Sequence, residues 1–181
     1  MITRALARDD PALLDERMKP LIQKGQPLWD KIIMASFAVL FAGWLVLMGF
    51  DAGRFHWSAM PAGLQWLGAA GILVSMRIWS RTHQANPFLA NVVKIQTERG
   101  HRVVTKGPYG LVRHPFYAAA LLFLPSGALM LGSWFGLAAA ILLASLLILR
   151  TALEDSELHR RLDGYAGYAE RVRYRLVPWL W

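Results

Sequence analysis

The chain has 181 residues, of which 55% are apolar and only 18% are charged, a composition that excludes disordered, collagen-like and disulfide-stabilised secreted proteins. It contains no cysteine, so a disulfide, a thiolate metal site and a cysteine nucleophile are excluded as well. Lys and Arg outnumber Asp and Glu by 20 to 12, an excess that fits either a nucleic-acid partner or a membrane protein with basic cytoplasmic loops.

The segment before the first apolar run, residues 1–31, mixes acidic and basic side chains and lacks the short apolar stretch of a secretory signal. Apolar residues recur in it at helical spacing, at Leu14, Met18, Leu21 and Ile22. We therefore expect a cytoplasmic amphipathic helix in this segment, lying on the membrane face.

Two uncharged stretches in the first half of the chain are long enough to cross a bilayer, whose hydrocarbon core is about 30 Å thick. Residues 32–50 contain no Asp, Glu, Lys or Arg and predict one transmembrane helix. The second stretch lies between Arg54 and Arg77 and predicts a helix over residues 61–79.

The third uncharged stretch, residues 116–149, would be about 51 Å long as a single helix, which is more than a bilayer needs. We expect it to turn back at Gly132-Ser133, giving helices over 116–131 and 134–149. The predicted fold is all-α, a polytopic membrane helix bundle of about four transmembrane helices with a cytoplasmic C-terminal helical segment. Residues 32–181 form its one membrane domain.

The basic residues predict the orientation of these helices. Of the 20 Lys and Arg, only Arg54 lies in the first connection and none lies in the Gly132-Ser133 turn. Short loops rich in Lys and Arg stay in the cytoplasm, so both termini and residues 80–115 are predicted cytoplasmic, as in a bacterial inner membrane. This topology accounts for the positive charge without a nucleic-acid partner.

Two polar segments, residues 91–117 and 150–178, then fall on the cytoplasmic side. Pro115 suits the first turn of a helix, which places His114 near the N-cap. Free backbone N–H groups there, together with Arg113 and His114, would favour a carboxylate or phosphate, and Tyr117 could present its hydroxyl to it. Alternatively, Arg113 only marks the end of a span and His114 only caps the helix.

The second polar segment opens with Arg150 and Glu154, four residues apart. They could form an ion pair on a solvated helix, worth about 0.3–0.5 kcal/mol. They could instead project into one pocket, one holding an anionic substrate and the other a cofactor. Spacing alone leaves both interpretations open.

Several other sites are not indicated. The histidines include no pair at metal-ligand spacing, so no metal site is expected. The sequence contains neither G-x-G-x-x-G nor G-x-S-x-G. Small residues such as Gly68 and Gly71 are best explained by close helix packing.

An ordered series of short motifs over about residues 86–178 resembles the isoprenylcysteine carboxyl methyltransferase family, including its small bacterial members. The series surrounds the uncharged hairpin and comprises Val103-Val104, Gly107-Pro108-Tyr109, Arg113-His114-Pro115-Phe116-Tyr117, Arg150, Glu154-Asp155, Tyr165, Tyr168 and Pro178. Two features depart from the family pattern: Asp155 stands where a second Glu is usual, and Leu162-Asp163-Gly164 replaces a Phe-Gly pair.

The resemblance implies an integral membrane enzyme that transfers a methyl group from S-adenosyl-L-methionine to a lipophilic, carboxylate-bearing or lipid-linked substrate at the cytoplasmic face. It implies cofactor contacts from Gln96, His101, Arg102, Val103, Val104, Tyr109, His114, Pro115, Phe116, Tyr117 and Glu154. Arg150 matches the substrate-binding arginine of the family, and Arg150 and Glu154 are the expected catalytic residues. Two alternatives stay open: an NADPH-dependent reductase of sterol-reductase-like architecture, or a non-catalytic membrane subunit in which Arg150 and Glu154 are structural.

Overall fold

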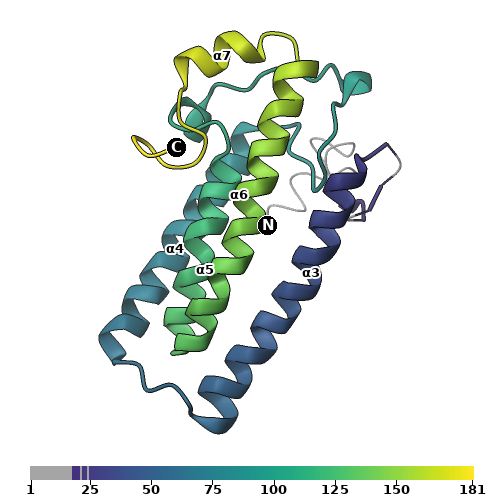
Figure 1. Ribbon diagram of the computed structural model, residues 1–181. Helices are drawn as coiled ribbons and strands as arrows, with labels where there is room; N and C mark the ends of the chain where they lie inside the picture. Colours follow the sequence, from purple (N-terminus) through teal and green to yellow (C-terminus); the bar gives the residue numbers. More distant parts are fainter. Residues whose placement is uncertain (1–17, 21, 24) are drawn as a thin grey trace.

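The computed structural model describes residues 18–20, 22, 23 and 25–181, and in this part of the chain the regular structure is entirely helical. Most of the expected amphipathic helix around Leu14 and Ile22 lies outside the described residues. Four long helices run side by side (Figure 1). They are α3 (Leu28–Met48), α4 (Ala62–Ala85), α5 (Pro115–Leu131) and α6 (Trp134–Arg161).

Each of the four predicted spans lies within, or nearly within, one of these helices, which confirms the predicted all-α bundle. The predicted break at Gly132-Ser133 is also observed. Gly132 adopts φ +77°, a left-handed conformation suited to glycine, and the Ser133 side chain accepts from Gly136 N–H to cap α6.

The end of the fourth predicted span is not the end of a helix, because α6 continues without interruption to Arg161. Helix α6 contains an apolar stretch long enough to cross a membrane. The same holds for α3 together with its π-helical extension η1 (Gly49–Phe55), and α5 is a shorter apolar helix. The extra turns of α6 carry Arg150, Glu154 and Asp155 out of the apolar part of the bundle.

Helices α4 and α5 pack closely, at points where α4 has glycine. A Cβ atom at Gly68 would meet the Met130 backbone nitrogen and would lie 2.6 Å from the Ser126 carbonyl oxygen. A Cβ atom at Gly71 would meet the Ser126 side chain. The prediction that these small residues serve helix packing is therefore confirmed.

Helix α3 packs mainly on α6. Near the turn end of the bundle, the Trp44 indole is buried and donates to the Gly136 carbonyl oxygen at 2.7 Å. Trp44 and Met48 join a core with Leu124 and Leu143. This contact fixes α3 near the turn, while its side chains from Ile33 to Leu45 include several that line the cavity described below.

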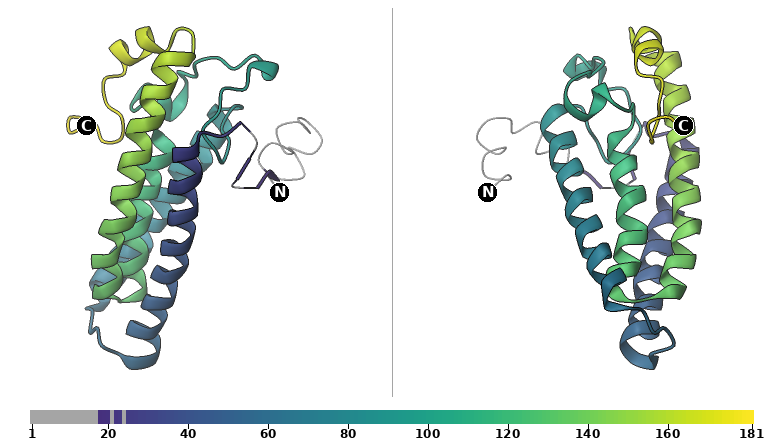
Figure 2. Two further views of the ribbon diagram at one scale, coloured as in Figure 1. Left: turned by 45° about the vertical axis from the view of Figure 1, so that its right-hand side comes forward. Right: turned by 90° about the vertical axis from the view of Figure 1, so that its left-hand side faces the viewer.

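The loops and the C-terminal segment gather at the other end of the bundle (Figure 2). The connection from α4 to α5 contains two 3₁₀ turns, η2 (Thr97–Arg99) and η3 (Gly107–Gly110). After α6 come the short helix α7 (Tyr165–Arg171) and residues 172–181, which we call the C-terminal strap. The strap returns to the start of α5, where the N–H groups of Arg113 and His114 donate to the carbonyl oxygens of Tyr174 and Arg175, each at 2.9 Å.

Candidate functional site

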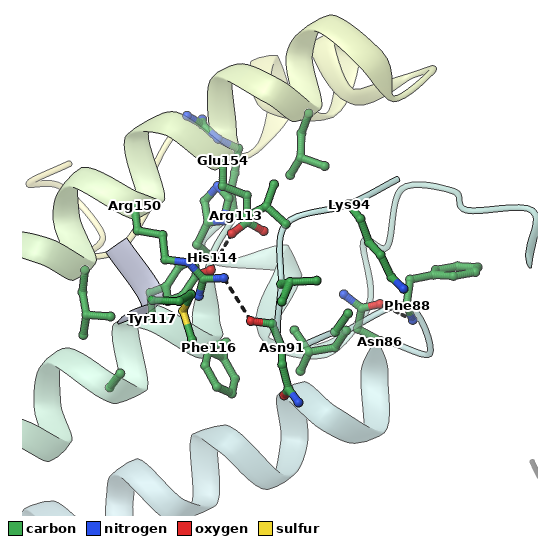
Figure 3. Close-up of a pocket in the computed structure, with 18 of the residues that line it drawn as sticks. Asn86, Phe88, Asn91, Lys94, Arg113, His114, Phe116, Tyr117, Arg150 and Glu154 are labelled. Atoms are coloured by element: carbon green, nitrogen blue, oxygen red, sulfur yellow. Dashed lines mark hydrogen bonds between the residues drawn. The ribbon is translucent and has the colours of Figure 1, made fainter. Parts of the chain in front are cut away.

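A cavity of about 770 Å³ lies where the α4–α5 connection meets α3, the N-terminal half of α5 and the C-terminal half of α6 (Figure 3). This volume is in the range of small-molecule and cofactor sites. Both predicted cytoplasmic segments, 91–117 and 150–178, contribute residues to its wall. Segments far apart in the sequence therefore meet around one space.

The cavity has an apolar part and a polar part. Its apolar wall comes from all four long helices and includes Ile33, Phe37, Phe41, Leu45, Trp79, Phe123, Leu124 and Leu147. Its polar wall comes from the α4–α5 connection and the upper parts of α5 and α6, and includes Asn86, Asn91, Lys94, His101, Arg102, His114, Arg150 and Glu154. One space can thus accommodate a charged group at one end and a hydrocarbon chain at the other.

Most of the sequence-predicted site residues lie on this wall. They are His101, Arg102, Val103, Val104, Tyr109, His114, Phe116, Tyr117, Arg150 and Glu154. Gln96 and Pro115 do not line the cavity, and both are fully buried. The Gln96 amide donates to the Phe88 carbonyl oxygen at 2.7 Å and accepts from Arg99 at 2.7 Å, so this side chain braces the loop.

Arg150 forms its ion pair with Asp30 of α3 and not with Glu154, so of the two interpretations left open by the spacing, the ion pair on a solvated helix is wrong. Its Nε donates to Asp30 Oδ1 at 2.8 Å, and a terminal nitrogen donates to the Asn91 carbonyl oxygen at 3.0 Å. The guanidinium also lies over the Tyr117 ring, 5.3 Å from its centroid. Arg150 is thus a buried, fixed group at the boundary between the polar and apolar parts.

Asp30, which holds Arg150 in place, is a residue of the candidate site that sequence reasoning missed. Its carboxylate is fully buried and also accepts from the Gln26 amide at 2.7 Å and from Val93 N–H at 3.0 Å. Asp30 therefore joins the start of α3, the α4–α5 connection and α6. The available signal was an acidic residue two positions before an apolar run, which does not reveal a partner in α6.

Glu154 is engaged by Tyr117 instead of by Arg150. The Tyr117 hydroxyl donates to Glu154 Oε2 at 2.5 Å, a charge-assisted hydrogen bond between α5 and α6. Figure 3 shows Glu154, Arg150 and Tyr117 together on one side of the cavity, with Asn91 facing Arg150. The two residues expected to be catalytic are therefore both held by partners from other segments.

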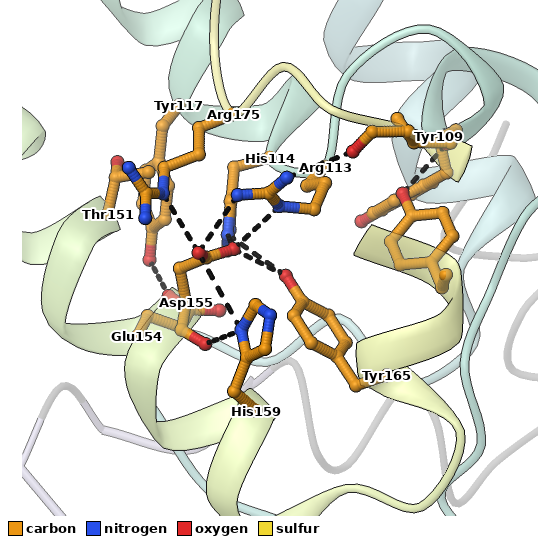
Figure 4. Close-up of polar contacts among 12 residues, drawn as sticks. Tyr109, Arg113, His114, Tyr117, Thr151, Glu154, Asp155, His159, Tyr165 and Arg175 are labelled. Carbon is orange, nitrogen blue, oxygen red and sulfur yellow. Dashed lines mark hydrogen bonds and ion pairs between the residues drawn. The ribbon is translucent and has the colours of Figure 1, made fainter. Parts of the chain in front are cut away.

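Asp155, the residue that departs from the family pattern, is the centre of a second buried network (Figure 4). Its carboxylate accepts two hydrogen bonds from Arg113, at 2.8 and 3.0 Å, and one from Arg175 at 2.8 Å. The Tyr165 hydroxyl donates to it at 2.8 Å, and His114 Nε2 lies 3.0 Å away. This network ties α5, α6, α7 and the C-terminal strap together.

The network changes the expected role of Arg113. Its remaining terminal nitrogen donates to the carbonyl oxygens of Val172 and Arg173, so each of its three nitrogens has an acceptor within the protein. Burial opposes the charge of Arg113, but the Asp155 carboxylate outweighs burial and raises the pKa of Arg113. Burial, with the Asp155 charge, raises the pKa of Tyr165, so its hydroxyl stays a neutral donor.

His101, in the α4–α5 connection, also lines the cavity. Its ring stacks on Phe88 with centroids 4.7 Å apart, and its Nδ1 accepts from Gln96 N–H at 3.3 Å. Burial lowers the pKa of His101, partly offset by the charge of Glu154. The ring is therefore neutral at pH 7 and presents an aromatic surface to the cavity. Within the described residues, no group of three His, Asp or Glu side chains could hold a metal ion.

Comparison with known proteins places the chain in a family. Residues 62–162, more than half of the chain, match the model of the phospholipid methyltransferase family. The chain belongs to this family. The match covers α4, α5, α6 and the connection between α4 and α5, while Asp30 and the C-terminal strap lie outside it.

Two individual proteins are similar to parts of the chain. A Delta(14)-sterol reductase from Mus musculus is 28% identical over 107 residues, which is 56% of this chain and 25% of the reductase. The structure of a eukaryotic intramembrane Ras methyltransferase, isoprenylcysteine carboxyl methyltransferase, superposes with a TM-score of 0.63 and 17% identity, covering 81% of this chain and 53% of that one. This likeness shows the fold, which is that of an integral membrane protein. The chain spans only a quarter and about half of the two relatives.

Proposed function

We propose that this protein transfers the methyl group of S-adenosyl-L-methionine to a lipophilic acceptor at the cytoplasmic face of the membrane. One observation carries the proposal: a single cavity joins a polar wall built from the motif residues to an apolar wall built from membrane helices. Membership of the phospholipid methyltransferase family supports the reaction class. The fold shared with an intramembrane methyltransferase supports the location.

The polar wall suits the chemistry of the methyl donor. S-adenosylmethionine supplies an electrophilic methyl group on a sulfonium cation, and it carries an amino-acid group and an adenine ring. Glu154 offers a carboxylate for the positive charge, and the stacked rings of Phe88 and His101 offer an aromatic surface for the adenine. Nε2 of His114 faces Asp155, so His114 would contact the cofactor through the rest of its ring. Phe116 would likewise contact the cofactor through its ring. Gln96 and Pro115 would act by shaping the wall.

The residues at the boundary would position the acceptor. Arg150 and Glu154 are held by Asp30 and Tyr117, so neither has to be ordered when a ligand enters. The apolar wall would hold the acceptor's hydrocarbon part and exclude water, and alignment of two reactants is worth roughly 7–11 kcal/mol in favourable cases. The predicted carboxylate on the acceptor, with Arg150 as its partner, stays part of the proposal. Asp30 would then share the guanidinium with it.

The proposed topology has four spans with both termini in the cytoplasm. The long helices supply the spans, and the loops with the basic residues gather at the end of the bundle that holds the cavity (Figure 1). The polar wall would then face cytoplasmic S-adenosylmethionine, and the apolar wall would face the lipid phase.

A second candidate function is an NADPH-dependent reduction, favoured by the sequence match to a sterol reductase. The two functions differ in the soluble ligand. A ligand that binds only the folded protein raises its unfolding temperature, so thermal unfolding of purified protein with each ligand separates them.

We expect S-adenosylmethionine, and not NADPH, to raise the unfolding midpoint, and we expect Glu154→Gln to reduce that shift. Glu157→Gln is the matched control, because Glu157 lies on the same helix but pairs with Arg160 and Arg161 away from the cavity. Stabilisation by NADPH alone would favour the reductase. No stabilisation by either ligand would favour a non-catalytic subunit.

A further inference from the structure

A second, smaller hollow of about 280 Å³ lies between the end of α7, the C-terminal strap and the loop after η3. Its lining includes Leu111, Arg171, Arg173, Tyr174 and Trp179, and it shares no residue with the larger cavity. The proposed methyl transfer assigns no role to this hollow. We call it, with the neighbouring residue Leu180, the strap corner.

The strap corner exposes large apolar side chains. Leu111 is 70% exposed, Trp179 is 88% exposed and Leu180 is 80% exposed. Single exposed apolar side chains are common on protein surfaces, but a group of them marks a surface that binds another molecule or a membrane. Indole rings in particular favour the interface between membrane and water.

The backbone holds Trp179 outward at a conformational cost. Trp179 has φ +64°, a left-handed conformation that is unfavourable for a bulky side chain. The N–H groups of Arg175, Leu176 and Val177 all donate to the Trp181 carbonyl oxygen, which closes a tight turn around this position. The turn therefore imposes the exposure of the indole.

Two arginines stand beside these apolar side chains. Arg171 and Arg173 are exposed, and in the described part of the chain neither guanidinium forms an ion pair with a carboxylate. Guanidinium groups bind phosphate oxygens through paired hydrogen bonds, and near an anionic bilayer each basic residue favours binding. Their charge is thus complementary to a phosphate group.

The position of the strap corner along the bundle also fits a contact with lipid head groups. In Figures 1 and 2 the strap lies beside the loop-facing end of α5, below α7. In the proposed topology this is the level of the cytoplasmic lipid head groups. We propose that the strap corner binds anionic phospholipid of the surrounding bilayer, with Arg171 and Arg173 on the phosphate and Trp179 and Leu180 at the acyl boundary.

Lipid binding would also hold the strap against the larger cavity. The strap supplies the carbonyl oxygens that bind Arg113 and supplies Arg175, which pairs with Asp155. Bound lipid should therefore protect the strap from trypsin, which cleaves after arginine. The inference depends on the proposed membrane orientation and not on methyl transfer, so it can be tested with no cofactor present.

The test measures phosphatidylglycerol retained by the purified full chain, after transfer from nanodiscs of phosphatidylcholine and phosphatidylglycerol. The variants are R171Q/R173Q and the matched control R160Q/R161Q, which removes two exposed arginines at the end of α6. We expect wild type and control to retain the lipid, and we expect retention by R171Q/R173Q to fall on the order of tenfold.

The charge-conserving variant R171K/R173K shows whether a loss reflects misfolding, and we expect it to keep most of the lipid and of the trypsin protection. Equal retention by R171Q/R173Q and the control would overturn the proposal. Displacement of the lipid by soluble glycerol phosphate would also overturn it, because the site would then bind a small anion and not a bilayer surface.

Discussion

Arg150 and Asp30 lie 120 positions apart in the sequence and form a buried ion pair at the polar end of the cavity. Removing one partner of a buried pair typically costs about 3–5 kcal/mol, because the other charge stays buried without compensation. We expect Asp30→Ala to lower the unfolding midpoint strongly and to weaken acceptor binding.

The control for Asp30 is Asp163→Ala, at an exposed position after α6. The double variant Asp30→Ala/Arg150→Ala completes a thermodynamic cycle that isolates the coupling of the two side chains. Additive losses of stability in this cycle would show that the pair is not coupled.

The sequence identifies much of the cavity wall but not how its charges are paired. The wall residues between His101 and Glu154 belong to short motifs, each of which can be recognised in the sequence by itself. The partner of Arg150 is not local, since Asp30 precedes the first apolar run. The i, i+4 spacing of Arg150 and Glu154 left a mutual ion pair open, and the observed contacts are instead with Asp30 and Tyr117.

His101 should give the protein a pH-dependent stability. Burial lowers its pKa below the ordinary value of 6.5, so the unfolded chain takes up a proton before the folded one does. Its contribution to stability is present above about pH 6.5 and is lost as the pH falls through the folded pKa. Protonation would also remove the acceptor for Gln96 N–H.

We expect the unfolding midpoint of wild type to decrease more steeply between pH 7.5 and pH 5 than that of His101→Gln. The comparison is made in one detergent, by circular dichroism, so that the other histidines contribute equally to both proteins. Parallel curves for the two proteins would rule out this role for His101.

At the scale of elements, Asp155 joins the C-terminal strap to the bundle. Asp155→Asn removes the charge that compensates Arg113 and Arg175, both of which donate to it. We expect trypsin to cleave the strap much faster in this variant and S-adenosylmethionine to stabilise it less. Ser156→Ala, at an exposed neighbouring position, should behave like wild type. A strap that stays resistant in Asp155→Asn would show that the backbone contacts at Arg113 and His114 suffice.

Helices α4 and α5 should tolerate no side chain at their closest approach. Gly68→Ala places a methyl group against the backbone of Met130 and Ser126, and overpacking of this kind costs about 1–3 kcal/mol. Gly63→Ala, in the first turn of the same helix, meets nothing within 4 Å and should leave stability unchanged or raised. Equal unfolding midpoints for the two variants would contradict the close packing.

The helices were predictable because uncharged runs, a glycine-serine break and the lengths of bilayer-spanning helices are local signals. The course of the strap was not, because it depends on Asp155 attracting Arg113 and Arg175 from opposite directions along the chain. The continuation of α6 to Arg161 depends likewise on packing of its polar turns against α5 and α7, which composition does not reveal.

At the scale of the whole molecule, the bundle brings a polar wall and an apolar wall to one cavity. The sequence predicted that residues 91–117 and 150–178 lie on the same side of the membrane. In the structure both segments line this cavity. In the proposed topology and function, a methyl donor from the cytoplasm and an acceptor from the lipid phase meet there without either crossing the membrane.

The most direct test is the transfer of label from methyl-labelled S-adenosylmethionine into a membrane lipid extract by purified protein. We predict label in the lipid fraction with wild type and with Glu157→Gln, and a loss of on the order of a hundredfold with Glu154→Gln, in the range for a positioned polar group at a reacting centre. No transfer by wild type, or equal transfer by Glu154→Gln, would contradict the proposal that the cavity around Glu154 is a methyltransferase site.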